Sequence, residues 1–209
     1  MSSTASKLPP LATLGPFIAL ILACAFFATQ SERFLSAQNF ALILQQVMVV
    51  AVIAIGQTLV ILTAGIDLSC GMVMALGGIV MTKMAADYGL SAPVAIACGM
   101  AVTMLFGLIN GLLVTKIKLP PFIVTLGTLN IAFAATQLYS GAQTITDIPA
   151  GMTALGNTFQ LGQTAIVWGA VLMLVLYLVT WFALRETAPG RHVSVSYTHL
   201  RAHETRHDL

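Results

Sequence analysis

Long apolar runs, separated by short stretches that contain polar residues, glycine or proline, set the pattern of this chain. These runs are continuous rather than alternating, and continuous runs of this length favour helices over strands. A helix rises about 1.5 Å per residue, so about 20 apolar residues cross the roughly 30 Å hydrocarbon core of a bilayer. Five runs have about this length and are predicted to be transmembrane helices: residues 11–29, 40–64, 92–115, 121–139 and 163–184.

A sixth apolar stretch, residues 71–82, is short enough for a re-entrant or interrupted helix. Lys and Arg residues concentrate in cytoplasmic loops, and this rule decides between the alternatives. If the stretch crosses and the N-terminus is cytoplasmic, Arg33 and Lys83 lie outside, and the remaining loop cations lie inside: Lys7, Lys116, Lys118, Arg185 and Arg191. If it dips in and returns, Lys116 and Lys118 fall outside. We therefore favour a short, tilted or broken spanning helix.

The predicted fold class is thus all-α: a polytopic transmembrane helix bundle with about six spans. Residues 1–10 form a short cytoplasmic N-terminus, residues 11–184 the transmembrane region, and residues 185–193 the start of a cytoplasmic loop. Composition agrees, because 58% of residues are hydrophobic and only 8% are charged, against about 25% charged in soluble domains. The lipid bilayer is therefore the expected surrounding. The net charge of +2 and the lack of interleaved basic and aromatic residues argue against nucleic acid as a partner.

Ionisable groups at membrane depth are scarce, although ion-driven transporters and intramembrane hydrolases both need them. Asp67 is the only carboxylate near the middle of an apolar region. It lies in the sequence Gly-Ile-Asp-Leu-Ser at residues 65–69, just before the short sixth stretch. Asp67 and Ser69 can cap the first turn of that helix. Alternatively, the glycine-flanked break lines a cavity, as interrupted helices do in transporters, and both roles are compatible.

A second interrupted region covers residues 110–128. Pro120 and Pro121 are predicted to end one helix and begin the next, because proline is tolerated in a first helical turn. Thr125 and Thr128 can face a pore or bond to their own helix backbone. Glycines also recur at spacings that let two helices approach closely, in particular Gly77 with Gly78, and Gly107 with Gly111.

The sequences GIDLS at residues 65–69, NGLLVTKIKLPPFIVTLGT at 110–128 and GRHV at 190–193 resemble the ribose-type permeases of bacterial ABC sugar importers. The resemblance covers roughly residues 40–193. It implies a permease homodimer in the inner membrane, driven by a cytoplasmic ATPase subunit and supplied by a periplasmic sugar-binding protein. The candidates for the transport path or for structural motifs are Gly65, Asp67, Ser69, Asn110, Gly111, Pro120, Pro121, Thr125, Gly127 and Thr128.

No catalytic residue, cofactor or metal site is predicted for this permease. The phosphate-binding sequence G-x-x-x-x-G-K-[ST] is absent from the chain, so ATP hydrolysis is expected in a separate subunit. Two alternatives stay open. One is a secondary transporter driven by ions, in which Asp67 would be essential. The other is a membrane-tethered zinc hydrolase that uses the terminal sequence His203-Glu204-Thr205-Arg206-His207, which matches the H-E-x-x-H pattern.

The last residues, 194–209, do not continue the permease pattern and resemble the translation of a sequencing adapter. We therefore expect a non-native tail on a truncated permease that lacks its coupling segment. This expectation weakens the zinc alternative, because the terminal histidines have no surrounding residues to orient them as metal ligands.

Overall fold

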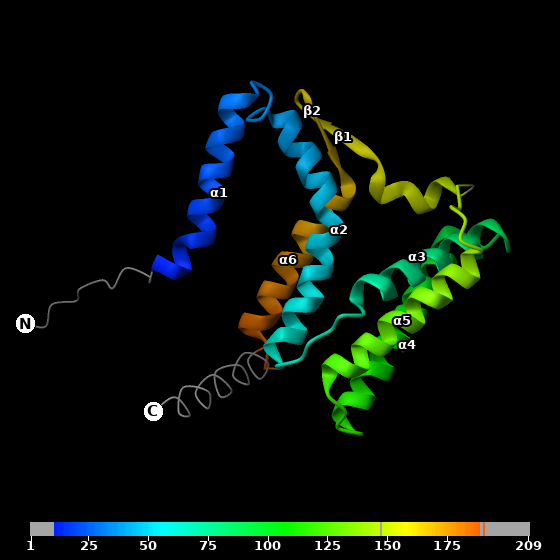
Figure 1. Ribbon diagram of the computed structural model, residues 1–209. Helices are drawn as coiled ribbons and strands as arrows, with labels where there is room; N and C mark the ends of the chain where they lie inside the picture. The colour runs from blue at the N-terminus through cyan, green and yellow to red at the C-terminus, as the bar shows by residue number, and fades with distance from the viewer. Residues whose placement is uncertain (1–10, 147, 189, 191–209) are drawn as a thin grey trace, which may run out of the picture.

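The computed structural model describes residues 11–146, 148–188 and 190. The predicted N-terminal segment, the tail with its H-E-x-x-H sequence, and three of the four residues of GRHV lie outside the described residues. The described part is mainly helical (Figure 1). Its elements are α1 (Leu11–Gln30), α2 (Ala37–Leu62), α3 (Cys70–Ala86), α4 (Ala92–Thr115), α5 (Pro121–Ser140), the 3-10 helix η1 (Ala150–Gly156), β1 (Thr158–Leu161), β2 (Thr164–Val167) and α6 (Trp168–Glu186).

The helical fold class is confirmed, because each of the six predicted apolar segments contains a helix. Among the described residues, α2, α4, α5 and α6 are long and apolar enough to cross a membrane. Two further apolar helices are shorter in this respect: Leu14–Gln30, within α1, and Cys70–Ala86, which is α3. Helix α3 is five residues longer than the predicted segment 71–82. Most of the extension lies at the C-terminal end of α3, where Lys83 is still helical.

One predicted boundary is wrong. Residues 163–167 were expected to begin the last helix, but β2 occupies residues 164–167 and pairs antiparallel with β1. Gly162 begins the two-residue turn with φ +64°, a conformation that hairpin turns require at this position. The β-branched residues Thr164, Ile166 and Val167 then favour the extended chain. An apolar run cannot by itself separate this strand from the helix that follows it.

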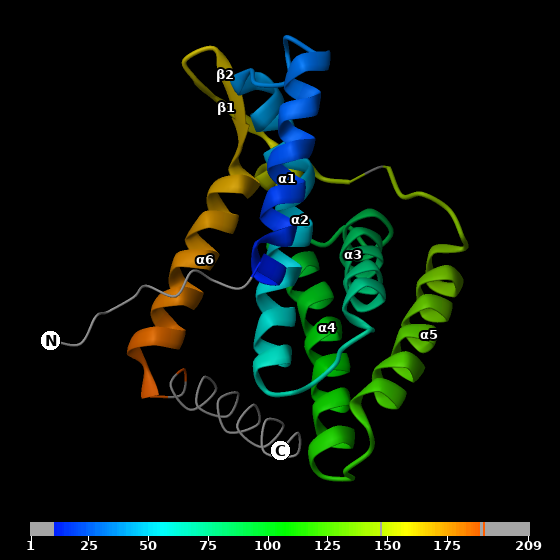
Figure 2. The same cartoon turned by 60° about the vertical axis from the view of Figure 1, so that its left-hand side comes forward.

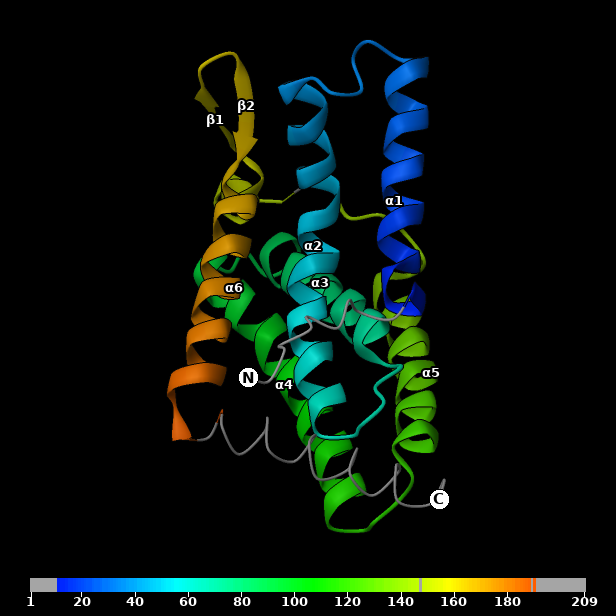
Figure 3. The same cartoon turned by 90° about the vertical axis from the view of Figure 1, so that its left-hand side faces the viewer.

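The helices form two groups (Figures 1 and 2). Helix α3 packs against both α4 and α5, while α2 packs against α6 and β2. Helix α1 stands apart from α2 in Figures 1 and 3. The small core lies between α3 and α5, where Val73, Leu76 and Ala132 are buried. Most other large apolar side chains are exposed, for example Leu138 at 84%, as expected for helices whose surrounding solvent is lipid.

The α1–α2 and α4–α5 connections lie at opposite ends of the molecule, and the α3–α4 connection lies between these levels (Figures 1 and 3). The C-terminal ends of α2 and α6 lie at the same end as the α4–α5 connection, which carries Lys116 and Lys118. The α1–α2 connection, which carries Arg33, lies at the other end. The C-terminal ends of α2 and α4 thus lie at the same end of the molecule.

Helices α3 and α4 touch through two glycines. A Cβ atom built on Gly99 would lie 2.6 Å from the carbonyl oxygen of Gly77, and one built on Gly77 would lie 2.5 Å from Thr103 Cγ2. At Gly78, Gly107 and Gly111, by contrast, a Cβ atom would meet nothing within 4 Å. The predicted close approach therefore occurs at Gly77, with Gly99 as its partner, and the Gly107 and Gly111 pair is not packed in this way.

The connection between α2 and α3 explains why α3 is short. Helix α2 ends in a left-handed residue, Ala64 at φ 57°, and the Gly65 amide donates to the Val60 carbonyl oxygen at 3.0 Å. The chain then turns back along the α4–α5 pair as a non-helical segment before α3 begins (Figure 1). Residues 65–69 are thus non-helical and α3 begins only at Cys70. That the two together cross the membrane as a broken helix stays a prediction.

Candidate functional site

The non-helical residues 65–69, which we call the break, lie against three helices, and polar side chains from two of them, α2 and α5, bind the backbone of the break. Irregular backbone at membrane depth is tolerated only where protein or water satisfies its polar groups. Gln57 of α2 donates from Nε2 to the Asp67 carbonyl oxygen at 3.0 Å. Thr125 Oγ1 of α5 lies 3.3 Å from the Ile66 carbonyl oxygen and 2.8 Å from that of Pro121 in its own helix. The break is therefore held by hydrogen bonds from side chains rather than by the regular backbone hydrogen bonds of a helix or sheet.

A chain of side-chain hydrogen bonds extends from this segment into α4 and α5. Ser69 donates to Asp67 Oδ1 from both its backbone nitrogen, at 2.7 Å, and its Oγ, at 2.6 Å. Asn110 Nδ2 donates to Ser69 Oγ at 3.1 Å, and Thr128 Oγ1 lies 2.5 Å from Asn110 Oδ1. Ser69, Asn110 and Thr128 are 1%, 8% and 7% exposed, so this network links three segments inside the bundle.

The network is fully paired. Among the described residues, no buried side-chain nitrogen or oxygen lacks a hydrogen-bond partner. Such pairing is needed because an unpaired polar group in an apolar surrounding costs several kcal/mol. We call the residues Asp67, Ser69, Asn110 and Thr128 the polar network.

Asp67 acts as a partial cap. Its carboxylate accepts from Ser69, the N-cap residue of α3, and Ser69 itself makes no side-chain capping bond. The expectation that both side chains accept from the first helical turn is therefore only partly met. The carboxylate lies near the N-terminus of α3, where the helix dipole favours negative charge. The described residues give Asp67 no ion pair: the two ion pairs in that part of the chain join Lys83 to Asp87 and Arg185 to Glu186.

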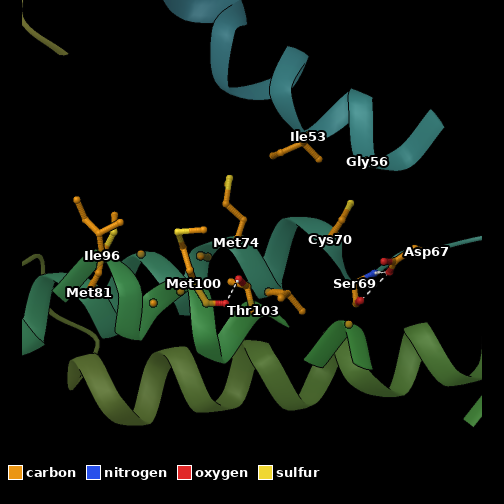
Figure 4. Close-up of a pocket in the computed structure, with 16 residues that line it drawn as sticks. Ile53, Gly56, Asp67, Ser69, Cys70, Met74, Met81, Ile96, Met100 and Thr103 are labelled. Atoms are coloured by element: carbon orange, nitrogen blue, oxygen red, sulfur yellow. Dashed lines mark hydrogen bonds between the residues drawn. The ribbon is translucent and has the colours of Figure 1, made fainter. Parts of the chain in front are cut away.

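Two cavities flank the break. The larger, of about 790 Å³, lies between α2, α3 and α4. Figure 4 shows Asp67 and Ser69 at one end of it and Met81 and Ile96 at the other. The smaller, of about 340 Å³, lies between the end of α2, the break, α4 and the start of α5. Both volumes fall in the range of small-molecule sites, about 300–1,000 Å³.

The structure brings most of the ten sequence candidates to this region. Ser69 lines the larger cavity and Asp67 lines both, while Thr128 is buried in the polar network. Pro120 is the N-cap of α5, and Gly127 lies on an exposed face of α5 with nothing near its Cβ position. The other five line the smaller cavity: Gly65, Asn110, Gly111, Pro121 and Thr125.

Gln57 is not among those ten candidates, although it holds the break. Its signal in the sequence is an amide inside an otherwise apolar run. Among the described residues, no group of three or more His, Cys, Asp or Glu residues can hold a metal ion.

Gln57→Leu is expected to lower the free energy of unfolding by about 1–3 kcal/mol, because the Asp67 carbonyl oxygen loses its donor inside the bundle. Gln46→Leu is the matched control, since Gln46 lies on the same helix with an exposed side chain. Unfolding of the purified protein in detergent measures both. Equal stability of the two variants would contradict the role assigned to Gln57.

The comparisons with known proteins agree with one another. A family model for the branched-chain amino acid transport system / permease component matches residues 39–202. The fructose import permease protein FrcC of Rhizobium meliloti is 44% identical over 184 residues, which cover 85% of this chain and 51% of FrcC. No solved structure matches this chain significantly.

Two further relatives carry different substrate names. The ribose import permease protein RbsC of Haemophilus influenzae is 35% identical, over 85% of this chain and 55% of RbsC. The autoinducer 2 import system permease protein LsrC of Salmonella typhi is 31% identical, over 84% of this chain and 49% of LsrC. The chain thus spans about half the length of the curated relatives it matches. The family match and these relatives show that the chain belongs to the family of branched-chain amino acid transport system / permease components, which are multi-pass membrane permeases of bacterial ABC importers.

Proposed function

We propose that this chain forms part of the sugar-conducting path of an ATP-driven importer. The observation that carries the proposal is the break at residues 65–69, with its polar network beside two cavities. Hydroxyl and amide groups suit a neutral, hydroxyl-rich substrate, whereas a charged substrate needs countercharges. Apart from Asp67, the described residues that line these cavities are uncharged.

The substrate class follows from the relatives. FrcC and RbsC are named for the import of fructose and ribose, while the family as a whole is described by branched-chain amino acids. We favour a monosaccharide such as fructose or ribose, because an amino acid would place an ammonium and a carboxylate in cavities that offer a single charged side chain. Autoinducer 2, for which LsrC is named, is a further candidate substrate.

The energy source is assigned to a partner. The membrane-embedded part lacks the chain of ionisable groups that proton-driven transporters use, and the sequence lacks a phosphate-binding loop. A cytoplasmic ATPase subunit is therefore proposed to drive the cycle, and an extracytoplasmic sugar-binding protein to deliver the substrate. A second copy of the permease is proposed to complete the transporter in the inner membrane.

The competing functions are distinguishable from this one. An ion-driven secondary transporter predicts that Asp67→Asn abolishes gradient-driven uptake in the absence of any ATPase. The zinc hydrolase relies on His203, Glu204 and His207, which lie outside the described residues, and predicts a metal content that His203→Ala removes.

Uptake of radiolabelled fructose and ribose tests the proposal. The full-length permease, co-reconstituted in liposomes with its ATPase and binding protein, is expected to accumulate one of these sugars only when ATP is present on the ATPase side. An ATPase variant without its phosphate-loop lysine should abolish accumulation, while a protonophore should not. Accumulation by the permease alone under a proton or sodium gradient would overturn the proposal.

A further inference from the structure

The two cavities that flank the break share two lining residues, Asp67 and Gly107. Asp67 comes from the break and Gly107 from α4. All other residues that line the larger cavity differ from those that line the smaller one. The two spaces therefore adjoin where Asp67 and Gly107 lie.

Packing does not account for the glycine at position 107. A Cβ atom built there would meet nothing within 4 Å, whereas one built on Gly99, two turns earlier in α4, would lie 2.6 Å from the Gly77 carbonyl oxygen. Glycine inside a helix is less favourable than alanine, so a helical glycine without a close neighbour gains nothing from helix contact. What Gly107 does provide is space at the junction of the cavities.

Asp67 is held rigidly on its side of this junction. Its backbone carbonyl accepts from Gln57, and its carboxylate oxygen Oδ1 accepts two hydrogen bonds from Ser69. Within the described part of the chain, both of these side-chain bonds go to Oδ1, which leaves Oδ2 available for another donor. A carboxylate oxygen accepts strong hydrogen bonds from hydroxyl groups, and a monosaccharide carries several of these.

We propose that Asp67 and Gly107 form the narrow point of the sugar path, with Gly107 keeping it open and Asp67 Oδ2 accepting a hydrogen bond from a hydroxyl group of the passing monosaccharide. This inference rests on the function proposed above. It adds a single narrow point and assigns a role to a residue outside the ten sequence candidates.

Gly107→Met tests whether the missing side chain at position 107 keeps the sugar path open. In the full-length permease with its ATPase and binding protein, uptake of radiolabelled fructose or ribose is expected to fall by roughly ten-fold or more, because pore width limits passage. Ala101→Met is the matched control: Ala101 is exposed on the same helix and lines neither cavity, so its uptake should equal that of the wild type. Co-purification of the ATPase should be unchanged in both variants.

Chemical labelling tests the inference without transport. Cys24, Cys70 and Cys98 are free and are replaced by alanine, and Gly107→Cys and Ala101→Cys are introduced in turn. A charged methanethiosulfonate reagent is expected to label Gly107→Cys from water and to leave Ala101→Cys unlabelled.

The outcomes separate the two proposals. Absence of monosaccharide uptake by the wild type would overturn the proposed function. Normal uptake by Gly107→Met, or an unlabelled Gly107→Cys in a permease that does transport sugar, would overturn the narrow point alone, because the space would then be closed by lipid or by protein.

Discussion

Asn110→Asp is expected to destabilise the protein more than Asn110→Ala does, although it preserves the size of the side chain. The Asn110 amide donates to Ser69 Oγ at 3.1 Å and lies 2.5 Å from Thr128 Oγ1. A carboxylate cannot donate, so the substitution removes the bond to Ser69. It also places a second carboxylate on the opposite side of the hydroxyl group that donates to Asp67.

The expected sizes follow from these two effects. Uncompensated charge in a buried site costs about 3–5 kcal/mol, and we expect Asn110→Asp to fall in that range. Asn110→Ala is expected to cost about 2 kcal/mol, because it removes two hydrogen bonds but leaves other partners in place. Ser69 keeps its bond to Asp67, and Thr128 keeps the Val124 carbonyl oxygen at 2.9 Å.

Thermal unfolding of the purified variants in detergent tests whether Asn110→Asp is less stable than Asn110→Ala. Asn130 provides the control, since it is exposed on α5 and donates to the Leu126 carbonyl oxygen of its own helix, at 2.8 Å. Asn130→Ala should change the free energy of unfolding by less than about 0.5 kcal/mol. If Asn110→Asp and Asn130→Ala unfold at the same temperature, the polar network does not hold the bundle together.

Most of the fold could be predicted from the sequence because the bilayer imposes one rule on the backbone. A segment surrounded by lipid must satisfy its own polar groups, which makes a long apolar run a helix almost irrespective of its neighbours. The prediction fails where an apolar segment pairs with another strand instead of forming a helix. Residues 163–167 are apolar enough for a helix, yet they pair with β1, and only Gly162 and the β-branched residues around it indicate the hairpin.

The candidate site was predictable in its parts but not in its connections. Asp67 stands out as a lone carboxylate, and Asn110 lies in an interrupted region, so both could be selected from the sequence. That Ser69 joins them depends on a contact across 41 sequence positions, which no local pattern encodes. Gln57 looks like any amide in a helix until the fold places it beside the Asp67 carbonyl oxygen.

Glycine spacing was the least informative signal. Gly107 and Gly111 have the spacing of a packed helix pair, yet both face open space. The glycine contact that forms, between Gly77 and Gly99, joins two helices whose relative position is set by the break before α3. The contact and the polar network therefore depend on each other: the glycines let α3 approach α4, and that approach brings Ser69 to Asn110.

Gly99→Ala is expected to destabilise the contact between α3 and α4 strongly, although it adds a single methyl group. Its Cβ would lie 2.6 Å from the Gly77 carbonyl oxygen and 3.0 Å from Met81 Cβ, and neither atom can move without moving α3. Overpacking of this kind costs about 1–3 kcal/mol, and we expect the upper part of that range because close contact drives helix association in lipid. Gly78→Ala is the control: it faces open space in α3 and should raise stability by up to about 1 kcal/mol through helix propensity.

A second substitution separates steric cause from general sensitivity of these helices. In Gly77→Ala the new Cβ would collide chiefly with Thr103 Cγ2, at 2.5 Å, and Thr103→Ser removes that methyl group while keeping the hydroxyl group that donates to Met100. The double variant Gly77→Ala, Thr103→Ser should therefore regain most of the melting temperature lost by Gly77→Ala. The same Thr103→Ser change should not rescue Gly99→Ala, because the atom in the way there is a backbone carbonyl oxygen. Rescue of both variants, or of neither, would mean that α3 and α4 are not held at the distance this structure shows.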